Sequence, residues 1–187
     1  MEIKTIAILG CGWYGLPMAN ELIQKGYKIK GSTTTEAKLN ILEQAGITPF
    51  LIDFKDDSLS KSKDFFECDV LLIAIPPKAK ETEGLNYAEK IKQIAEIASE
   101  NNVKQIILIS STGIYPDNNF IVDETIVPIP NTVAGKALQE GEQILASNNT
   151  FKTTIIRFAG LIGPERNLAK HFAGKADIAN GLAPINL

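Results

Sequence analysis

A glycine-rich hexamer near the N-terminus constrains the fold of this chain more than any other feature. The hexamer, GCGWYG at residues 10–15, directly follows a continuous apolar run from Thr5 to Leu9. Such a run is typical of a strand buried on both faces of a parallel sheet. Apolar residues then recur at helical spacing over 16–23, and a second strand is expected at 27–30. The chain therefore begins with a strand–turn–helix–strand unit of about 30 residues.

In this context the hexamer predicts a turn that binds the pyrophosphate of a dinucleotide. Gly10 permits a tight turn, Gly12 lets the backbone approach the pyrophosphate, and Gly15 allows the helix to pack closely on the strand. The anion would lie against unpaired N–H groups at the start of the helix. Trp13 and Tyr14 stand between the glycines, where we expect them either to cover the cofactor or to pack against the first helix.

The end of the second strand indicates which dinucleotide fits. An acidic residue there would bind the ribose 2′-hydroxyl of NAD and repel the 2′-phosphate of NADP. This chain has Ser32, Thr33 and Thr34 instead, with Lys38 just beyond them. Hydroxyls and a lysine accept a phosphate, so the sequence favours NADP, with NAD as the alternative. An arginine, the usual partner of that phosphate, is missing here, and the hydroxyls would otherwise serve to cap the next helix.

Strands and helices continue to alternate as far as residue 162. Further strands are expected at 48–52, 69–75, 105–109 and 153–158, and helices at 36–44, 87–100 and about 133–147. This alternation predicts an α/β protein with a doubly wound parallel sheet, the three-layer α/β/α Rossmann fold. We take residues 1–162 as an NAD(P)-binding domain. Periodicity is lost over 163–187, which we interpret as the start of an incomplete C-terminal substrate-binding region.

Several residues at the ends of the later strands are expected beside the cofactor. Asp53 follows the third strand, where it would either bind the adenine amine or serve only in a turn. Ile75 and Pro76 end the fourth strand and would form a wall of the site, and Ser110 ends the fifth. Arg157, near the end of the sixth strand, is expected to anchor a local salt bridge.

Composition excludes several other classes of function. The net charge of −3 and the pI near 5.3 provide no basic patch, so nucleic acid is not an expected partner. The chain has no signal peptide and no apolar run of the roughly 20 residues that cross a bilayer, so we expect a cytoplasmic protein without membrane contact. Cys11 and Cys68 are expected to be free thiols. His171, the single histidine, has no cluster of potential ligands around it, so no metal site is expected.

Four segments together resemble the extended short-chain dehydrogenase/reductase superfamily. They are the glycine turn, SSTGIY at 110–115, GK at 135–136 and RFAGLIGP at 157–164. The chain is most similar to the atypical members known as NAD-dependent epimerase/dehydratase-like proteins, over almost its whole length. The resemblance implies an NADP(H)-dependent oxidoreductase or epimerase for a small polar or nucleotide-sugar-like substrate. It also implies a homodimer formed through the helices at 87–100 and 133–147.

In that family a Ser or Thr and a Tyr-x-x-x-Lys pair carry out catalysis. By resemblance, Ser111 (with Thr112 beside it) matches the hydroxyl residue, and Lys136 matches the lysine that contacts the nicotinamide ribose. The tyrosine position is Thr132, whose hydroxyl is a far weaker acid than a phenol of pKa about 10. Tyr115 would either replace that acid or pack beside the site, and Lys136 would otherwise be a solvated helix residue. Two functions remain open: the enzyme, and a non-catalytic NAD(P)-binding sensor or regulatory protein.

Overall fold

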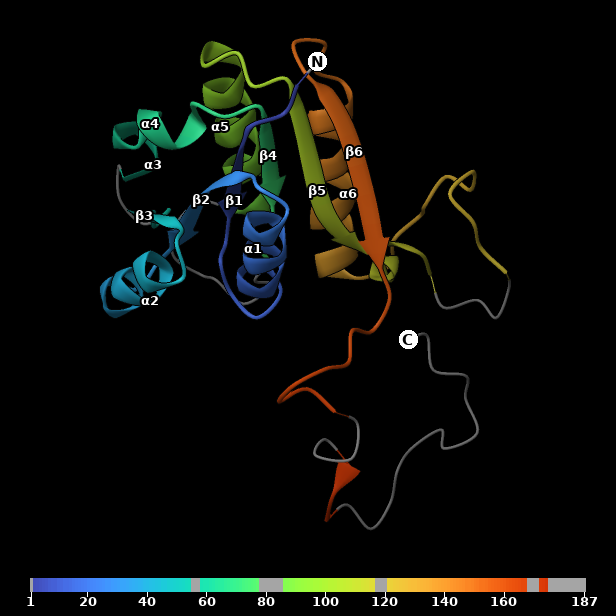
Figure 1. Ribbon diagram of the computed structural model, residues 1–187. Coiled ribbons are helices and arrows are strands. Elements are labelled where there is room, and N and C mark those ends of the chain that lie inside the picture. Colours follow the sequence, from blue (N-terminus) through green and yellow to red (C-terminus); the bar gives the residue numbers. More distant parts are fainter. Residues whose placement is uncertain (1, 55–57, 78–85, 117–120, 168–171, 175–187) are drawn as a thin grey trace.

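Six parallel strands form one sheet at the centre of the protein (Figure 1). The computed structural model describes residues 2–54, 58–77, 86–116, 121–167 and 172–174. The strand order is β3-β2-β1-β4-β5-β6, and every neighbouring pair is parallel. The strands are β1 (Thr5–Leu9), β2 (Lys28–Thr33), β3 (Thr48–Leu51), β4 (Val70–Ile73), β5 (Gln105–Ser111) and β6 (Lys152–Phe158). The predicted doubly wound α/β fold is confirmed.

Helices cover both faces of the sheet. In Figure 1, α1 lies in front of the strands, whereas α5 and α6 lie behind them. The α-helices are α1 (Gly15–Gln24), α2 (Leu39–Gln44), α3 (Ser58–Lys61), α4 (Lys63–Phe66), α5 (Tyr87–Glu100) and α6 (Val133–Ala146), with 3-10 turns η1 (Glu36–Lys38) and η2 (Thr112–Ile114). Among the described residues, no helix has both the length and the apolar character needed to span a bilayer.

Alternate residues of the central strands enter two separate cores. In β1, Ile6 and Ile8 pack into the core beneath α1 and α2. Ala7 and Leu9 point the other way, into the core beneath α4, α5 and α6. Because both faces are covered, the strand is apolar at every position from Ile6 to Leu9 and shows no alternation of polar residues. The continuous apolar runs of the sequence thus come from the position of each strand in the middle of three layers.

The second strand is longer than its sequence pattern predicts. It continues beyond Lys30 to Thr33, because Thr33 pairs with Leu51 of β3 and its carbonyl accepts a hydrogen bond from the Ile52 N–H at 2.9 Å. The helix expected at 36–44 is divided into η1 and α2, and the short helices α3 and α4 were not predicted. The extension of β2 places Ser32 and Thr33 inside the sheet rather than beyond its edge.

The sheet topology creates a crevice at the carboxyl ends of β1 and β4. The chain leaves β1 toward β2 on one side and leaves β4 toward β5 on the other. Ligands of open α/β sheets bind at this kind of switch point, outside the carboxyl ends of the strands. The glycine turn follows β1, and Ile75 follows β4, so both flank this crevice.

Candidate functional site

The glycine turn has a backbone that side chains at two of its positions would disrupt. Gly10 has φ of +103°, and a Cβ added there would lie 3.1 Å from the carbonyl oxygen of Ala74, beyond the end of β4. A Cβ on Gly15 would come within 2.3 Å of the Gly10 carbonyl oxygen. Both glycines are therefore required for the turn to form and for α1 to start so close to β1.

Gly12 differs from these two glycines because it is exposed and a Cβ at this position would meet no protein atom within 4 Å. Helix α1 starts three residues later, with no acidic residue in its first turn and no side chain capping it from Tyr14. The first N–H groups of a helix lack intrahelical acceptors and attract anions. The open surface at Gly12, next to this helix end, can accept a pyrophosphate.

Ser32 holds the turn in place from the neighbouring strand. Its hydroxyl accepts a hydrogen bond from the Gly10 N–H at 2.9 Å, and its carbonyl accepts one from the Cys11 N–H at 2.8 Å. The residue is only 3% exposed, so its hydroxyl faces the turn and not the outer edge. Thr33 is buried as well, and its hydroxyl accepts from the Thr35 N–H at 3.2 Å.

Of the residues predicted to meet a 2′-phosphate, only Thr34 and Lys38 are exposed. Thr34 is the first residue beyond β2, and Lys38 ends η1. The two therefore stand at the outer end of β2, where the second ribose of a bound dinucleotide lies in this fold. Thr34 and Lys38 therefore remain accessible to a ligand. The hydroxyls of Ser32 and Thr33 instead accept hydrogen bonds from backbone N–H groups.

The other predicted wall residues flank the crevice from β3 and β4. The side chain of Ile75 is half-buried, and its Cγ2 would lie 3.2 Å from a Cβ on Gly10. Pro76 is exposed beside it. Asp53 is half-buried just beyond β3 and has a polar interaction of its own. These placements agree with a wall formed by Ile75 and Pro76, and a contact of Asp53 with adenine stays a prediction.

Trp13 and Tyr14 make contacts that sequence reasoning did not foresee. The Tyr14 ring packs edge-on against Phe158 at the end of β6, with ring centres 5.3 Å apart. The Trp13 indole N–H donates to the carbonyl of Pro164 at 2.7 Å. Both side chains of the turn therefore contact the end of β6 and the segment that follows it.

Ser111 and Ser110 at the end of β5 have different environments. The Ser111 hydroxyl accepts a hydrogen bond from the Gly113 N–H at 3.1 Å, and its side chain is half-buried at the carboxyl edge of the sheet. Ser110 is buried and donates to Glu142 at 2.6 Å, so its hydroxyl is directed into the protein. Of the two, Ser111 is the one in a position to meet a ligand.

Thr132 and Lys136 lie at the start of α6. The Thr132 hydroxyl caps this helix by accepting from the Gly135 N–H at 3.0 Å. Lys136 is exposed, whereas Leu138 is only 4% exposed and packs into the core beneath α5 and α6. Two residues rotate a helix by about 200°, so Lys136 projects away from the face that packs on the sheet. Contact of Lys136 with the nicotinamide ribose stays a prediction.

Glu142 is a buried charge that sequence reasoning missed. Its side chain is 6% exposed and binds the Arg157 guanidinium, with Nη2 to Oε2 at 2.7 Å. The hydrogen bond to Glu142 raises the pKa of Arg157 above its ordinary value. The ion pair expected at Arg157 is therefore present. The missed signal is helical phase, because Glu142 lies four residues after Leu138 on the buried face of α6.

The same guanidinium binds the phenol of Tyr115. Arg157 Nη1 donates to the Tyr115 hydroxyl at 2.5 Å, and that hydroxyl donates to the carbonyl of Asp123 at 3.0 Å. The guanidinium also lies 5.2 Å from the centre of the tyrosine ring. Tyr115 thus links β6 to the loop before α6, and its oxygen is held next to a positive charge.

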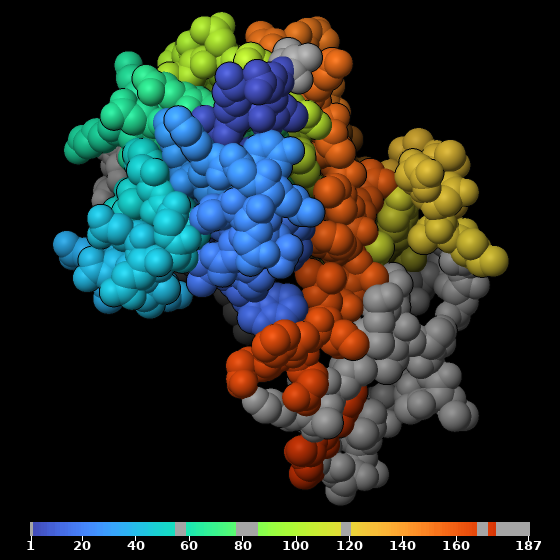
Figure 2. All heavy atoms as spheres, in the orientation of Figure 1, coloured from blue at the N-terminus to red at the C-terminus, as the bar shows by residue number. Residues whose placement is uncertain are grey.

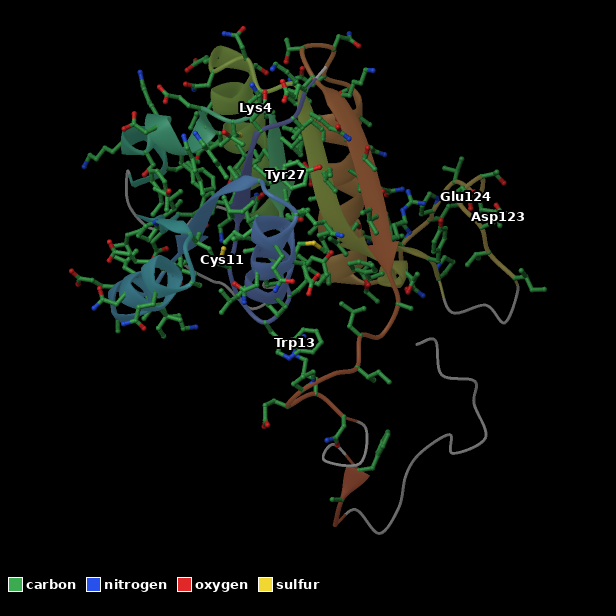
Figure 3. All side chains as sticks on the ribbon, viewed as in Figure 1. Lys4, Cys11, Trp13, Tyr27, Asp123 and Glu124 are labelled. Atoms are coloured by element: carbon green, nitrogen blue, oxygen red, sulfur yellow. The ribbon has the colours of Figure 1, made fainter. Side chains whose placement is uncertain are left out.

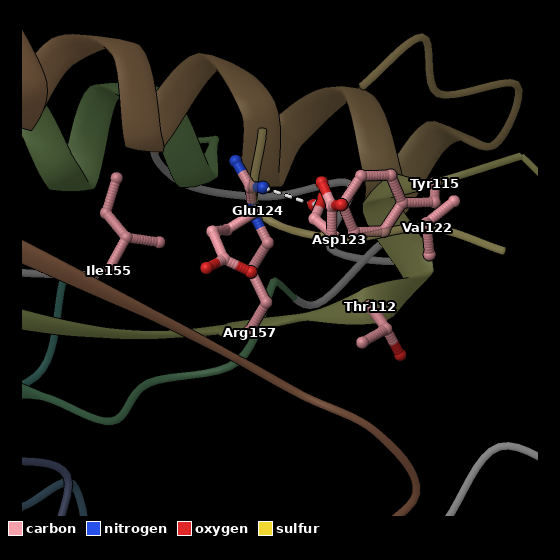
Figure 4. A pocket seen from close by; sticks show the side chains of 7 residues that line it. All are labelled: Thr112, Tyr115, Val122, Asp123, Glu124, Ile155 and Arg157. Carbon is pink, nitrogen blue, oxygen red and sulfur yellow. Dashed lines mark hydrogen bonds between the residues drawn. The ribbon is translucent and has the colours of Figure 1, made fainter. Parts of the chain in front are cut away.

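A pocket of about 390 Å³ opens beside this network, between the ends of β5 and β6 and the loop that contains Asp123 (Figure 4). The two Thr125 hydrogen bonds, from its hydroxyl and its N–H, hold the pKa of Asp123 below its usual range, so this carboxyl stays ionised. The pocket therefore combines hydroxyl, phenol and carboxylate groups on one side of the sheet. Its lining residues are Thr112, Tyr115, Val122, Asp123, Glu124, Ile155 and Arg157.

Both cysteines are free, as expected. Burial raises the pKa of the Cys11 thiol to about 12 and that of Cys68 to about 11, which makes both poor nucleophiles at neutral pH. Within the described ranges, no three His, Cys, Asp or Glu side chains converge as metal ligands. His171 lies outside the described residues, as do 175–187 of the predicted second region.

The fold and the glycine turn define an NAD(P)-binding protein of the Rossmann class. Residues 10–181 match the family described as NAD(P)H-binding, and the chain belongs to that family. It is 31% identical over 176 residues to the protein YeeZ of Escherichia coli K12, an alignment that covers 92% of this chain and 64% of YeeZ. The chain thus spans less than two thirds of the length of this relative.

Solved structures show the same fold. An NAD-dependent epimerase/dehydratase homologue from Methylobacillus flagellatus is 26% identical with a TM-score of 0.69, and the match covers 88% of this chain and 57% of that one. The UDP-glucuronic acid 4-epimerase of Bacillus cereus, in complex with UDP-glucuronic acid and NAD, is 20% identical with a TM-score of 0.68, over 85% of this chain and 57% of that one. The predicted resemblance to epimerase/dehydratase-like proteins is confirmed at the level of the NAD(P)-binding fold.

Proposed function

We propose that the chain binds NADP(H) in the crevice between β1 and β4 and acts as an oxidoreductase or epimerase on a small polar, nucleotide-sugar-like substrate. The main support for this proposal is the exposed backbone at Gly12, because no neighbouring atom lies within 4 Å of a Cβ added there. It opens at the same edge of the sheet as the half-buried Ser111. A dinucleotide on the turn would extend along this edge toward Ser111.

The preference for NADP(H) rests on Thr34 and Lys38. Both are exposed beyond β2, and residues 31–35 contain no carboxylate that would repel a 2′-phosphate. Lys38 supplies a positive charge and Thr34 a hydroxyl donor for that phosphate. The sequence also predicted Ser32 and Thr33 beside the 2′-phosphate. These two residues contribute by shaping the turn and the end of β2.

For catalysis we assign Ser111 to hydrogen-bond the substrate oxygen through its hydroxyl. We assign Tyr115 as the residue that exchanges a proton with the substrate. The guanidinium of Arg157, 2.5 Å from the phenol oxygen, stabilises negative charge that develops there. We assign this charge stabilisation to Arg157, and we keep for the exposed Lys136 the contact with the nicotinamide ribose that the resemblance implies. The nearby carboxylates of Asp123 and Glu124 accept hydrogen bonds from a hydroxyl-rich substrate in the pocket.

Calorimetric titration with NADPH and NADH tests the coenzyme proposal. We expect tighter binding of NADPH, and we expect Lys38→Ala to narrow the difference by weakening NADPH alone. Lys92→Ala, which removes an exposed lysine from α5, is the matched control and should leave both affinities unchanged. Equal affinities of the unmodified protein for NADPH and NADH would refute a 2′-phosphate site.

A second candidate function, binding of NAD(P) without turnover, is favoured by Thr132. At the position of the family tyrosine this residue caps α6 and offers no phenol. A panel of carbonyl substrates with NADPH separates the two functions. Turnover that disappears in Tyr115→Phe, with NADPH affinity retained, supports the enzyme. Tight NADPH binding without turnover, and turnover gained in Thr132→Tyr, supports a sensor derived from an enzyme.

A further inference from the structure

The indole of Trp13, the only tryptophan of the chain, joins the glycine turn to the segment after β6. Its N–H donates to the Pro164 carbonyl at 2.7 Å. The guanidinium carbon of Arg166 lies 4.4 Å from the centre of its ring, which is a stacking distance. Figure 3 shows the Trp13 side chain extending from the turn toward this segment, and in Figure 2 the two regions adjoin on the surface.

The backbone of this segment is shaped around the indole. Gly163 and Arg166 exchange two backbone hydrogen bonds, at 2.9 and 3.0 Å, and so close a tight turn. A Cβ on Gly163 would lie 2.9 Å from Cζ2 of Trp13. A side chain at Gly163 would therefore displace the ring. The contact between Trp13 and the turn at 163–166 is built from three independent features: a hydrogen bond, a ring–cation stack and a close glycine approach.

The position of Arg166 suits a cation that acts on a bound phosphate. Trp13 directly follows Gly12 and lies two residues before the start of α1, and the start of a helix carries partial positive charge. A guanidinium stacked on the Trp13 ring is not stabilised by this positive helix end, but its charge adds to the attraction of an anion at the turn. Stacking occupies the flat face of the guanidinium and leaves its N–H groups, which lie in the plane, available to phosphate oxygens.

We propose that Arg166 binds the pyrophosphate of the dinucleotide on the glycine turn and that Trp13 holds its guanidinium in place. This inference rests on the proposed function, because it assigns a further residue to the same coenzyme site. It brings a residue from beyond β6 into a site that otherwise consists of the ends of β1, β2 and β4. The pyrophosphate is common to NADPH and NADH, so Arg166 contributes equally to both.

Titration calorimetry on Arg166→Ala, Arg166→Lys and Trp13→Phe tests the proposal. Arg166→Ala should weaken NADPH and NADH by the same factor, about tenfold, as expected for the loss of a charged hydrogen bond. Arg166→Lys should recover part of the affinity, and Trp13→Phe should weaken both coenzymes. Lys38→Ala is the matched comparison, because it should weaken NADPH alone. Unchanged thermal midpoints show that each variant is folded.

Three results would overturn the inference. If the unmodified chain binds neither coenzyme, the proposed function fails and the inference fails with it. If the unmodified chain binds coenzyme and Arg166→Ala binds it equally well, the proposed function stands and Arg166 has no part in it. If Arg166→Ala weakens UDP but neither coenzyme, the guanidinium serves a phosphate of the substrate and not the pyrophosphate of the coenzyme.

Discussion

Glu142 of α6 and Arg157 of β6 form a forked ion pair, with Nη2 2.7 Å from Oε2 and Nε 3.1 Å from Oε1. Ser110 donates to the same carboxylate at 2.6 Å, so three elements meet at one buried charge. Breaking a buried ion pair on one side leaves an uncompensated charge. The pair therefore controls how α6 and the ends of β5 and β6 sit relative to each other.

From this pair we predict that Glu142→Gln lowers the free energy of unfolding by about 3 kcal/mol. Replacing both partners, Glu142→Gln with Arg157→Met, should recover part of the loss, because no unpaired cation remains. Urea denaturation of the unmodified chain, both single variants and the double variant measures the coupling. Additive losses would show that the two side chains do not stabilise the fold as a pair.

Gly12 and Gly15 should respond in opposite ways to the same substitution. In Gly12→Ala the new methyl meets no protein atom, so the thermal midpoint should stay within about 2 °C while coenzyme affinity falls at least tenfold. In Gly15→Ala the methyl would lie 2.3 Å from the Gly10 carbonyl oxygen, so the fold itself should lose stability. Differential scanning calorimetry and coenzyme titration on both variants check this. Coenzyme affinity retained in Gly12→Ala would place the ligand elsewhere.

Asp69 should make stability depend on pH in the acid range. Its carboxylate accepts from Lys104 Nζ at 2.6 Å and from the N–H groups of Lys4 and Thr5, and these bonds hold its pKa well below the usual range. A lowered pKa in the folded state stabilises the fold above the unfolded pKa of about 4, and this contribution is lost as the pH falls below that value.

We therefore expect Asp69→Asn to cost about 1–2 kcal/mol at pH 7 and progressively less below about pH 4. Urea denaturation of both proteins between pH 3 and pH 7 gives the difference in unfolding free energy. A difference that stays constant down to pH 3 would contradict the assignment to the ionised carboxylate.

Thr132 should stabilise α6, the helix that it caps. Thr132→Ala removes the acceptor of the Gly135 N–H and should cost about 1 kcal/mol of stability, whereas Thr132→Ser should keep most of it. Thr132→Tyr loses the cap as well, so a gain of activity in that variant would appear despite a lower thermal midpoint. Thermal denaturation followed by circular dichroism compares the three variants, and equal midpoints for the alanine and serine variants would argue against the cap.

Much of the fold could be read from local patterns. The apolar run of β1 and the glycines of the turn predicted the first unit correctly, because each depends on its own backbone and its burial between layers. The predicted end of β2 at residue 30 was wrong, because the strand continues to Thr33. Its sequence is polar in part, and its length is set by pairing with β3. Pairing partners distant in sequence leave no local trace.

The sequence by itself determined the glycine turn and the dinucleotide-binding class. The tertiary structure alone decided where side chains point: Ser32 inward to Gly10, Lys136 away from the sheet, and Trp13 toward Arg166. The physical reason is that Gly10 is required by its own positive φ and Gly15 by a steric clash with Gly10, five residues away. The direction of a side chain instead depends on the rotation of its helix and on partners as much as 151 positions away.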